Sequence, residues 1–286
     1  MKPAGLYLDM PTEEYFSDPA QEPSLTQSLA KILLEQSPLH AWMAHPRLNP
    51  AFQRDDEKKF DIGSVAHALL LGRGKDIVPI DFGDWRTKAA REAREAAAAD
   101  FKLAVKRKDY DLAVGMAGTA RSKMKTLGLF DVPVHAEAVI MWQESGLWCR
   151  TMIDALERPS YLTVFDYKTT AASAAPSAIP AKMVNDGWDI QAAFHSAALD
   201  SISPETAGKR RHIFICQENY EPYACGIYQL DEATMTMGRK KMLMALELWD
   251  RCIKSNQWPA YPDSVIRPQY PTWAENEWIA REMRRE

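Results

Sequence analysis

The stretch LTVFDYKTT, residues 162–170, decides how this chain folds. Its apolar, β-branched and aromatic residues predict a β-strand. Side chains alternate along a strand, so Asp166 and Lys168 share one face with Val164, while Tyr167 points the other way. An acid and a lysine at the end of an apolar face are costly to bury unless they are paired. The two side chains are therefore either a structural ion pair or a site for a metal ion and a phosphate, and this strand alone does not decide between them.

The segments around this strand extend it into a sheet. VHAEAVIMW (134–142) and LWCRTMIDAL (147–156) are also short and apolar, and turn residues separate the three stretches, so we expect three antiparallel strands. Further along the chain we expect a helix at about 178–200, strands at 210–218 and 223–230, and a long helix at 231–255. Strands with helices on both sides predict an α/β fold with a central mixed β-sheet flanked by helices.

The first half of the chain is predicted to be mainly helical. Residues 24–45 predict a helix that begins at a capping Ser24, Thr26 or Ser28 and is interrupted at Ser37-Pro38. The stretch FDIGSVAHALLLG (60–72) predicts a second helix, with His67 among apolar neighbours.

Residues of about 84–128 are rich in Ala, Glu, Lys and Arg, which favours a helical insertion. The charged run at 54–59 predicts a solvated loop. We expect one domain over residues 1–286, with the sheet-bearing core at about 134–230.

The composition excludes several classes of protein. Of the 286 residues 46% are hydrophobic, and no uninterrupted apolar stretch is long enough to predict a membrane span. The N-terminus has no apolar run of signal-peptide length, so we expect a soluble, cytoplasmic protein. None of the four cysteines lies in a C-x-x-C pair, which disfavours a zinc ribbon or an iron–sulfur cluster and favours reduced thiols. The net charge of −4 leaves nucleic acid possible as a partner, because binding needs only a local positive track.

A second carboxylate lies close to Asp166 in the expected sheet. Asp154 is near the end of the preceding strand, and the turn at 157–161 is short enough to bring the two carboxylates together. Two adjacent carboxylates repel each other, and a bound Mg²⁺ or Mn²⁺ would remove that conflict. Glu137 on the first strand could supply a third carboxylate.

Ile153-Asp154, then eleven residues, then Asp166-Tyr-Lys168 resembles the signature of PD-(D/E)xK nucleases, which have a restriction-endonuclease-like core. The wider pattern is similar to the exodeoxyribonuclease VIII (RecE-type) branch of phages and prophages. The elements that carry this similarity are GSVAHALLLG, HAEAVIMW, RTMIDAL, VFDYKTT and DIQAAFH, with the early SLTQSLAKILLEQSPLHAW and the late QWPAYP. They span nearly the whole chain, and five elements in this order are far more specific than the bare D…D-x-K pattern.

The resemblance implies an enzyme that hydrolyses phosphodiester bonds with Mg²⁺, for which Mn²⁺ can substitute. The groups it implies as metal ligands are His67, Asp154, Asp166 and the backbone carbonyl of Tyr167. The residues it implies as catalytic are Asp154, Asp166, Lys168, Glu137 and Gln191. Lys168 would orient the nucleophile and stabilise charge on phosphorus. Relatives of this branch act as 5′→3′ exonucleases on double-stranded DNA ends, leave a 3′ single strand for an annealing protein in DNA recombination, and form ring-shaped oligomers.

The chain departs from the branch on the helix after the lysine strand. Relatives commonly have Q-x-x-x-Y there, whereas this chain has Gln191 and His195, which share one helix side. The departure affects only the expected contact with a DNA strand. Some basic side chains are candidates for phosphate contact, although such charges are more often ordinary surface charges: Lys102, Lys106, Arg107, Lys108, Lys182, Arg210, Arg211, Arg239, Lys240 and Lys241.

Three alternatives remain open from the sequence. The same fold and metal site could belong to a structure-specific endonuclease or junction resolvase, which would cut closed circular DNA. The chain could be a non-enzymatic DNA-binding recombination scaffold, although Asp154, Asp166 and Lys168 are all present. It could also be a purely structural protein with an acid–lysine ion pair, in which case Mn²⁺ would not stabilise it.

Overall fold

The computed structural model describes residues 1–53, 62–73, 76–100, 102–129 and 131–284, so the expected charged loop at 54–59 lies outside the described residues. A mixed six-stranded sheet forms the centre, in the order β1-β4-β5-β6-β7-β8. Its strands are β1 (Gly5–Tyr7), β4 (Val134–Glu144), β5 (Leu147–Glu157), β6 (Thr163–Thr170), β7 (Arg211–Glu218) and β8 (Cys225–Gln229). Strands β6 and β7 are parallel, and the other neighbours are antiparallel. The predicted mixed sheet and its three consecutive antiparallel strands are confirmed, and β1 adds an edge strand that the sequence did not predict.

One face of the sheet is covered by four helices that form the largest core. These are α2 (Gln27–Glu35), α3 (Pro38–Met43), α8 (Trp188–Ile202) and α9 (Glu232–Ser255). Trp142 of the sheet packs edge-on against Phe194 of α8, and Trp249 of α9 completes the cluster. Thr26 caps α2 through the amide of Leu29, as one of the expected caps.

The prediction of a single helix at about 178–200 is wrong in one respect. It is divided into α7 (Ile179–Asp186) and α8, because Gly187 between them has φ +76°, a left-handed conformation that ends a helix. Helix α8 packs on the sheet together with α2, α3 and α9, whereas Ile179 of α7 packs with Trp188 of α8 and Phe214 of β7.

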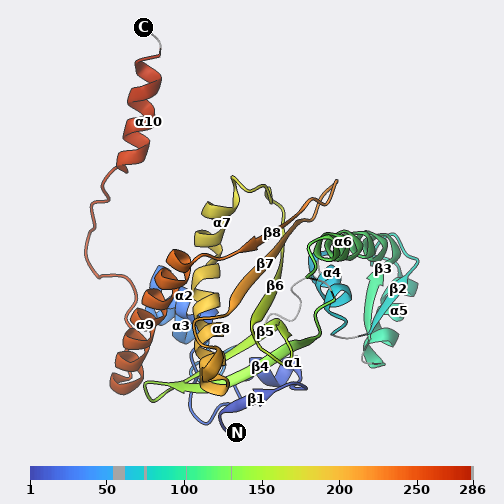
Figure 1. Cartoon of the computed structure of the whole chain (residues 1–286), viewed down its shortest axis with the longest axis horizontal. Coiled ribbons are helices and arrows are strands. Elements are labelled where there is room, and N and C mark those ends of the chain that lie inside the picture. Colours follow the sequence, from blue (N-terminus) through green and yellow to red (C-terminus); the bar gives the residue numbers. More distant parts are fainter. Residues whose placement is uncertain (54–61, 74–75, 101, 130, 285–286) are drawn as a thin grey trace.

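The opposite face carries α4 (Ile62–Leu71) and α6 (Arg107–Thr126), which pack on Phe165 and Tyr167 of β6. The expected helical insertion at about 84–128 contains α5 (Lys88–Ala99) and α6, and between them the short β3 (Leu103–Lys106) pairs in parallel with β2 (Ile77–Ile80), which precedes the insertion. This small layer lies beside the central sheet in Figure 1. Its strands are four residues each, too short to stand out from the helix-forming residues around them.

The N-terminal segment packs on the central sheet, whereas the C-terminal helix does not. Near the N-terminus, α1 (Thr12–Phe16) packs against the outer side of β4 and β5. A short 3₁₀ turn (Pro204–Thr206) links α8 to β7, and the chain ends in α10 (Thr272–Glu282), which projects away from the rest of the molecule (Figure 1). No described helix has both the length and the apolar character required to cross a membrane.

Candidate active site

The hydrogen-bond ladder between β5 and β6 ends where the acidic residues begin. Ala155 pairs with Phe165 and Leu156 with Val164, and the next residues along the two strands are Asp154 and Asp166. There the amide of Tyr167 donates to the Asp154 carboxylate at 3.0 Å. The Asp154 side chain thus takes the place of a β5 backbone carbonyl as the acceptor of this hydrogen bond. Beyond this point β6 diverges from β5 (Figure 1).

Asp154 is held from two sides. Its Oδ2 accepts from the Tyr167 amide and lies 3.1 Å from Nε2 of His67 on α4. Helix α4 can approach this closely because of Gly63, where an added Cβ would lie only 2.2 Å from Oγ1 of Thr169. The Asp154 side chain remains 19% exposed, so it can reach a ligand in the gap between the strands.

Asp166 is almost completely buried, with 2% of its side chain exposed. Its Oδ1 lies 2.7 Å from Nζ of Lys168, and its Oδ2 accepts a hydrogen bond from the side-chain amide of Gln191 on α8. The lysine contact lacks hydrogen-bond geometry, so Oδ1 is buried without a directed donor from the described residues. The predicted shared face of Asp166 and Lys168 is confirmed, because both lie on the α8 side while Tyr167 packs under α4 and α6.

Glu137 occupies a strained position directly opposite Asp154. The pairs Ala136 with Ala155 and Ala138 with Ile153 put it there, and its φ is +53°. Side-chain alternation along β5 also breaks at this point. Ile153 packs on the α8 side of the sheet and Ala155 on the α4 side, although simple alternation would give both the same side. The Glu137 carboxylate is close enough to His67 to raise the pKa of that imidazole.

The two aspartates have opposite pKa shifts. Burial alone would raise the pKa of Asp154, but His67, Lys168 and the Tyr167 amide together lower it to about 2. Burial and the neighbouring Asp154 charge raise the pKa of Asp166 to about 6, against the attraction of Lys168. Burial would lower the pKa of Lys168, but both aspartates, with a contribution from Asp186 on α7, raise it above its ordinary value. Sequence reasoning missed Asp186, because nothing in the sequence signals its proximity.

The donors in the gap suit a hard divalent cation. Asp166 Oδ1 is a buried, undirected carboxylate oxygen beside a second carboxylate. The N–H and C=O of one strand residue point toward the same neighbouring strand, so the Tyr167 carbonyl also faces the gap. Within the described ranges no three His, Cys, Asp or Glu side chains already form a metal cage. An ion here would complete its coordination with water or a phosphate, as Mg²⁺ commonly does.

Gln191 and His195 have different surroundings although they lie one turn apart. Gln191 reaches Asp166, whereas His195 is 1% exposed and its ring stacks on His212 with 6.4 Å between centroids. Burial and the His212 ring lower the pKa of His195 to about 3, which keeps it neutral. The expected contact of this position with a DNA strand is therefore absent from this arrangement.

Most basic side chains singled out from the sequence are paired with acids, which weakens their case as a phosphate track. The ion pairs are Lys102–Asp100 (3.4 Å), Lys106–Asp109 (3.1 Å), Arg107–Asp81 (2.8 Å), Lys182–Asp186 (2.8 Å), Arg210–Asp200, Arg239–Glu144 (2.7 Å) and Lys241–Asp189 (2.6 Å). Arg211 instead donates to the hydroxyl of Thr163 at 3.0 Å.

A mixed sheet with helices on both faces, and two acids and a lysine where the ladder between two central strands stops, is typical of the PDDEXK-like class of folds. The chain belongs to the family described as "PDDEXK-like domain of unknown function (DUF3799)", whose model matches residues 28–265. Nucleases of this class generally use divalent metal ions.

A solved structure agrees on the fold. The crystal structure of a "Putative exonuclease" from Eubacterium rectale aligns with a TM-score of 0.59 at 11% identity, covering 92% of this chain and 97% of its own. The structure of SSO0001 aligns with a TM-score of only 0.32 at 12% identity, covering 81% of each chain, which is too low to support an argument. No curated protein sequence matches the chain.

Proposed function

We propose that this chain is a Mg²⁺-dependent exodeoxyribonuclease that degrades linear double-stranded DNA in the 5′→3′ direction, with Mn²⁺ able to replace Mg²⁺. The observation that carries the proposal is the gathering of Asp154, Asp166 and Lys168 where the β5–β6 ladder stops. A purely structural ion pair would not need a second carboxylate that raises the pKa of the first.

Asp154, Asp166 and the Tyr167 carbonyl are the groups proposed to hold the cation. His67 either joins them or, as bonded to Asp154 here, fixes the direction of that carboxylate. When bound, the ion lowers the pKa of a coordinated water and screens the negative phosphate. Its charge also removes the repulsion between the two carboxylates, which is the unfavourable interaction in the metal-free site.

Lys168 is proposed to act directly on the substrate. Its side chain is 30% exposed and its ammonium pairs with Asp166, which raises the lysine pKa, so the ammonium stays protonated and can turn toward a phosphate oxygen or the attacking water. Gln191 holds Asp166 from the α8 side and limits the positions its carboxylate can adopt. Glu137 is proposed to bind a second ion or to orient a water, because it lies opposite Asp154.

The wider biology follows from the resemblance to the exodeoxyribonuclease VIII (RecE-type) branch and is proposed with it. The enzyme would act in the cytoplasm as one nuclease domain within a homo-oligomer. The 3′ single strands it leaves would pass to a single-strand annealing protein during phage recombination.

The decisive experiment uses linear duplex labelled at the 5′ or the 3′ end, with Mg²⁺ or with EDTA. We expect rapid release of the 5′ label in Mg²⁺, slow release of the 3′ label, and no reaction in EDTA. Asp166→Asn and Lys168→Ala should each abolish digestion, whereas Asp250→Asn, an exposed acid on α9 that pairs with Lys254, should leave it unchanged.

Covalently closed circular duplex separates the alternatives. An exonuclease spares the circle, whereas a structure-specific endonuclease or junction resolvase of the same fold nicks it or cuts branched DNA. Binding of DNA without digestion under any metal would indicate a recombination scaffold. Full activity of Asp166→Asn would refute the assignment of the site itself.

A further inference from the structure

The C-terminal arm, residues 262–284, carries exposed apolar side chains that the proposed nuclease site does not use. Every side chain in it except Ala274 is exposed, and the family match ends at residue 265. Trp273 is 70% exposed, Ile279 45% and Met283 73%. An isolated helix of eleven residues is marginal in water, so α10 needs a surface to pack against.

The arm is built to reach away from its own body. Its root is fixed, because the amide of Leu39 donates to the carbonyl of Pro259 and the Tyr261 ring lies 5.5 Å from that of His40 on α3 in a tilted arrangement. The ten residues from 262 to 271 include Pro262, Pro268 and Pro271, and proline-rich linkers are extended and semi-rigid. Such a linker spans roughly 30 Å and disfavours a return to the surface beside its root.

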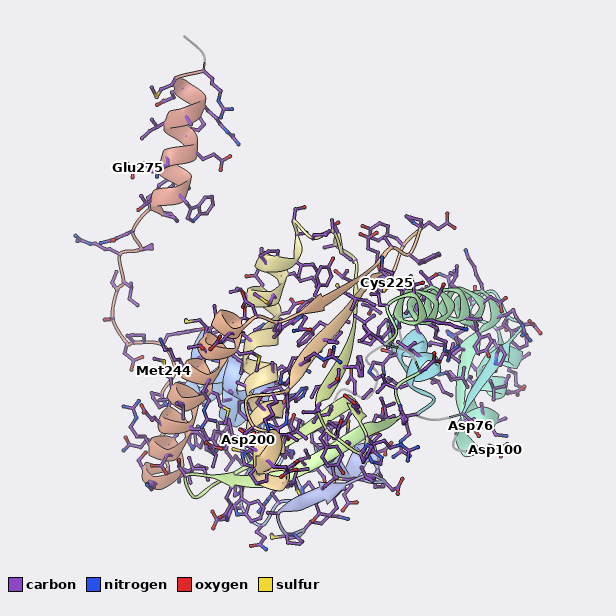
Figure 2. The ribbon with its side chains drawn as sticks, viewed as in Figure 1. Asp76, Asp100, Asp200, Cys225, Met244 and Glu275 are labelled. Carbon is purple, nitrogen blue, oxygen red and sulfur yellow. The ribbon has the colours of Figure 1, made fainter. Side chains whose placement is uncertain are left out.

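A matching surface is exposed on α9. Met237 is 49% exposed and Met244 62%, and with the exposed Lys240 they recur at helical spacing on one side of the helix. The arm has a corresponding stripe of Trp273, Ala280 and Met283, with Ile279 beside it. Figure 2 shows Met244 on α9 and Glu275 on the projecting α10, well separated within one chain.

The charges of the two helices are complementary. On α9 the exposed Lys240 lies between Met237 and Met244, whereas three other basic side chains of this helix are paired with acids. Helix α10 has one basic and three acidic side chains, a net charge of −2. Opposite charges around two apolar stripes favour the pairing of α10 with α9 over the pairing of two α10 helices.

We propose that α10 docks onto the exposed α9 face of a second copy of this chain. The interface is an arm exchange between copies, and it is formed by side chains outside the nuclease site. If the exchange is reciprocal it gives a two-fold dimer, and if each arm reaches the next copy in one direction it closes a ring.

The test is the oligomeric state of the full chain, measured by light scattering after size exclusion at micromolar concentration. The wild type should be a dimer or larger. Met244→Glu, and separately the pair Trp273→Ala with Met283→Ala, should weaken association about 100-fold, which corresponds to about 2.8 kcal/mol. The control is Val114→Glu on α6, because Val114 is a comparably exposed apolar residue, at 45%, away from both stripes, and this change should leave association unchanged.

A charge exchange tests the pairing itself. Lys240→Glu should weaken association, and mixing that chain with one carrying Glu275→Lys and Glu277→Lys should restore mixed assemblies. A monomeric wild type would overturn the proposal, even if the arm then bound some other protein. Unchanged association of the Met244→Glu chain would also overturn it. Melting temperatures of the variants check that each remains folded, and none of these measurements depends on nuclease activity.

Discussion

Asp166→Asn should stabilise the metal-free protein while destroying its activity. In the wild type an ionised Asp166 is buried beside Asp154, and the pKa of Asp166 is raised to about 6. The asparagine amide carries no charge, so it avoids both the desolvation cost of a buried carboxylate and the repulsion by Asp154. Gln191 can turn its side-chain amide to accept from the new asparagine, and Lys168 can still donate to its oxygen.

The magnitude follows from the pKa of Asp166. A raised acid pKa means that ionisation destabilises the folded state. The cost is complete above about pH 6 and disappears as the pH falls below the unfolded value of about 3.9. The rise to about 6 corresponds to about 3 kcal/mol at pH 8 and about 1.5 kcal/mol at pH 5, as upper bounds. The asparagine chain should therefore melt about 5 °C higher than wild type at pH 8 in EDTA, with a smaller gain at pH 5.

The assay is thermal unfolding of both chains in EDTA and in Mn²⁺. A metal at ten times its Kd adds about 1.4 kcal/mol to the wild type, and it should add nothing to the asparagine chain, so Mn²⁺ narrows the gap between them. The exposed control Asp250→Asn should shift neither curve appreciably. An asparagine chain that is less stable than wild type at pH 8 in EDTA, or equally responsive to Mn²⁺, would refute this account of the site.

Three further changes test the site and its support. Lys168→Arg should keep the fold but reduce nuclease activity at least about 100-fold, because the planar guanidinium cannot replace a compact ammonium as a point donor; assays with excess DNA measure it. Arg150→Met should cost about 3 kcal/mol in chemical denaturation, because it removes the buried partner that lies 2.9 Å from Asp18 and leaves that acid with only His45 at 3.2 Å and Arg47 at 3.7 Å as charged neighbours. Gly238→Ala should cost about 1–3 kcal/mol, because a Cβ on α9 would lie 2.0 Å from the Asp189 carbonyl oxygen on α8.

The two stability changes, Gly238→Ala and Arg150→Met, have matched controls. Gly115→Ala on α6 meets no atom within 4 Å and should stabilise the chain slightly by improving helix propensity. Lys254→Met breaks an exposed ion pair and should change stability by less than about 1 kcal/mol. Equal losses in the control and test variants would show that the contacts named here do not determine the energies.

The sheet was predictable because its strands carry local signals. The alternating apolar residues and short turns of 134–170 are sufficient to identify β4, β5 and β6, and alternation alone places Asp166 and Lys168 on one face. The pieces that were missed lack such signals. Strand β1 has three residues, and it is defined by its partner β4 rather than by its own sequence.

The site was only partly predictable for a physical reason. Simple alternation of side chains fails on β5, where Ile153 and Ala155 face opposite sides of the sheet. The distortion lies beside Glu137, whose backbone has a positive φ, and no residue type in this stretch predicts it. Long-range contacts decide the rest. His195 is buried against His212, and Lys182 pairs with Asp186, so two residues expected near DNA have other partners.

The backbone amide of Tyr167 has two possible hydrogen-bond partners, a carbonyl of β5 or the Asp154 carboxylate. It would extend the sheet by one more rung if β5 offered a carbonyl, but here it secures the Asp154 side chain. This one N–H group can either extend the β5–β6 hydrogen-bond ladder or hold the Asp154 carboxylate, but it cannot do both. A substitution that let β5 and β6 pair along their full length would inactivate the site without changing either aspartate or the lysine. The sequence motif of such a chain would still look like that of an active nuclease.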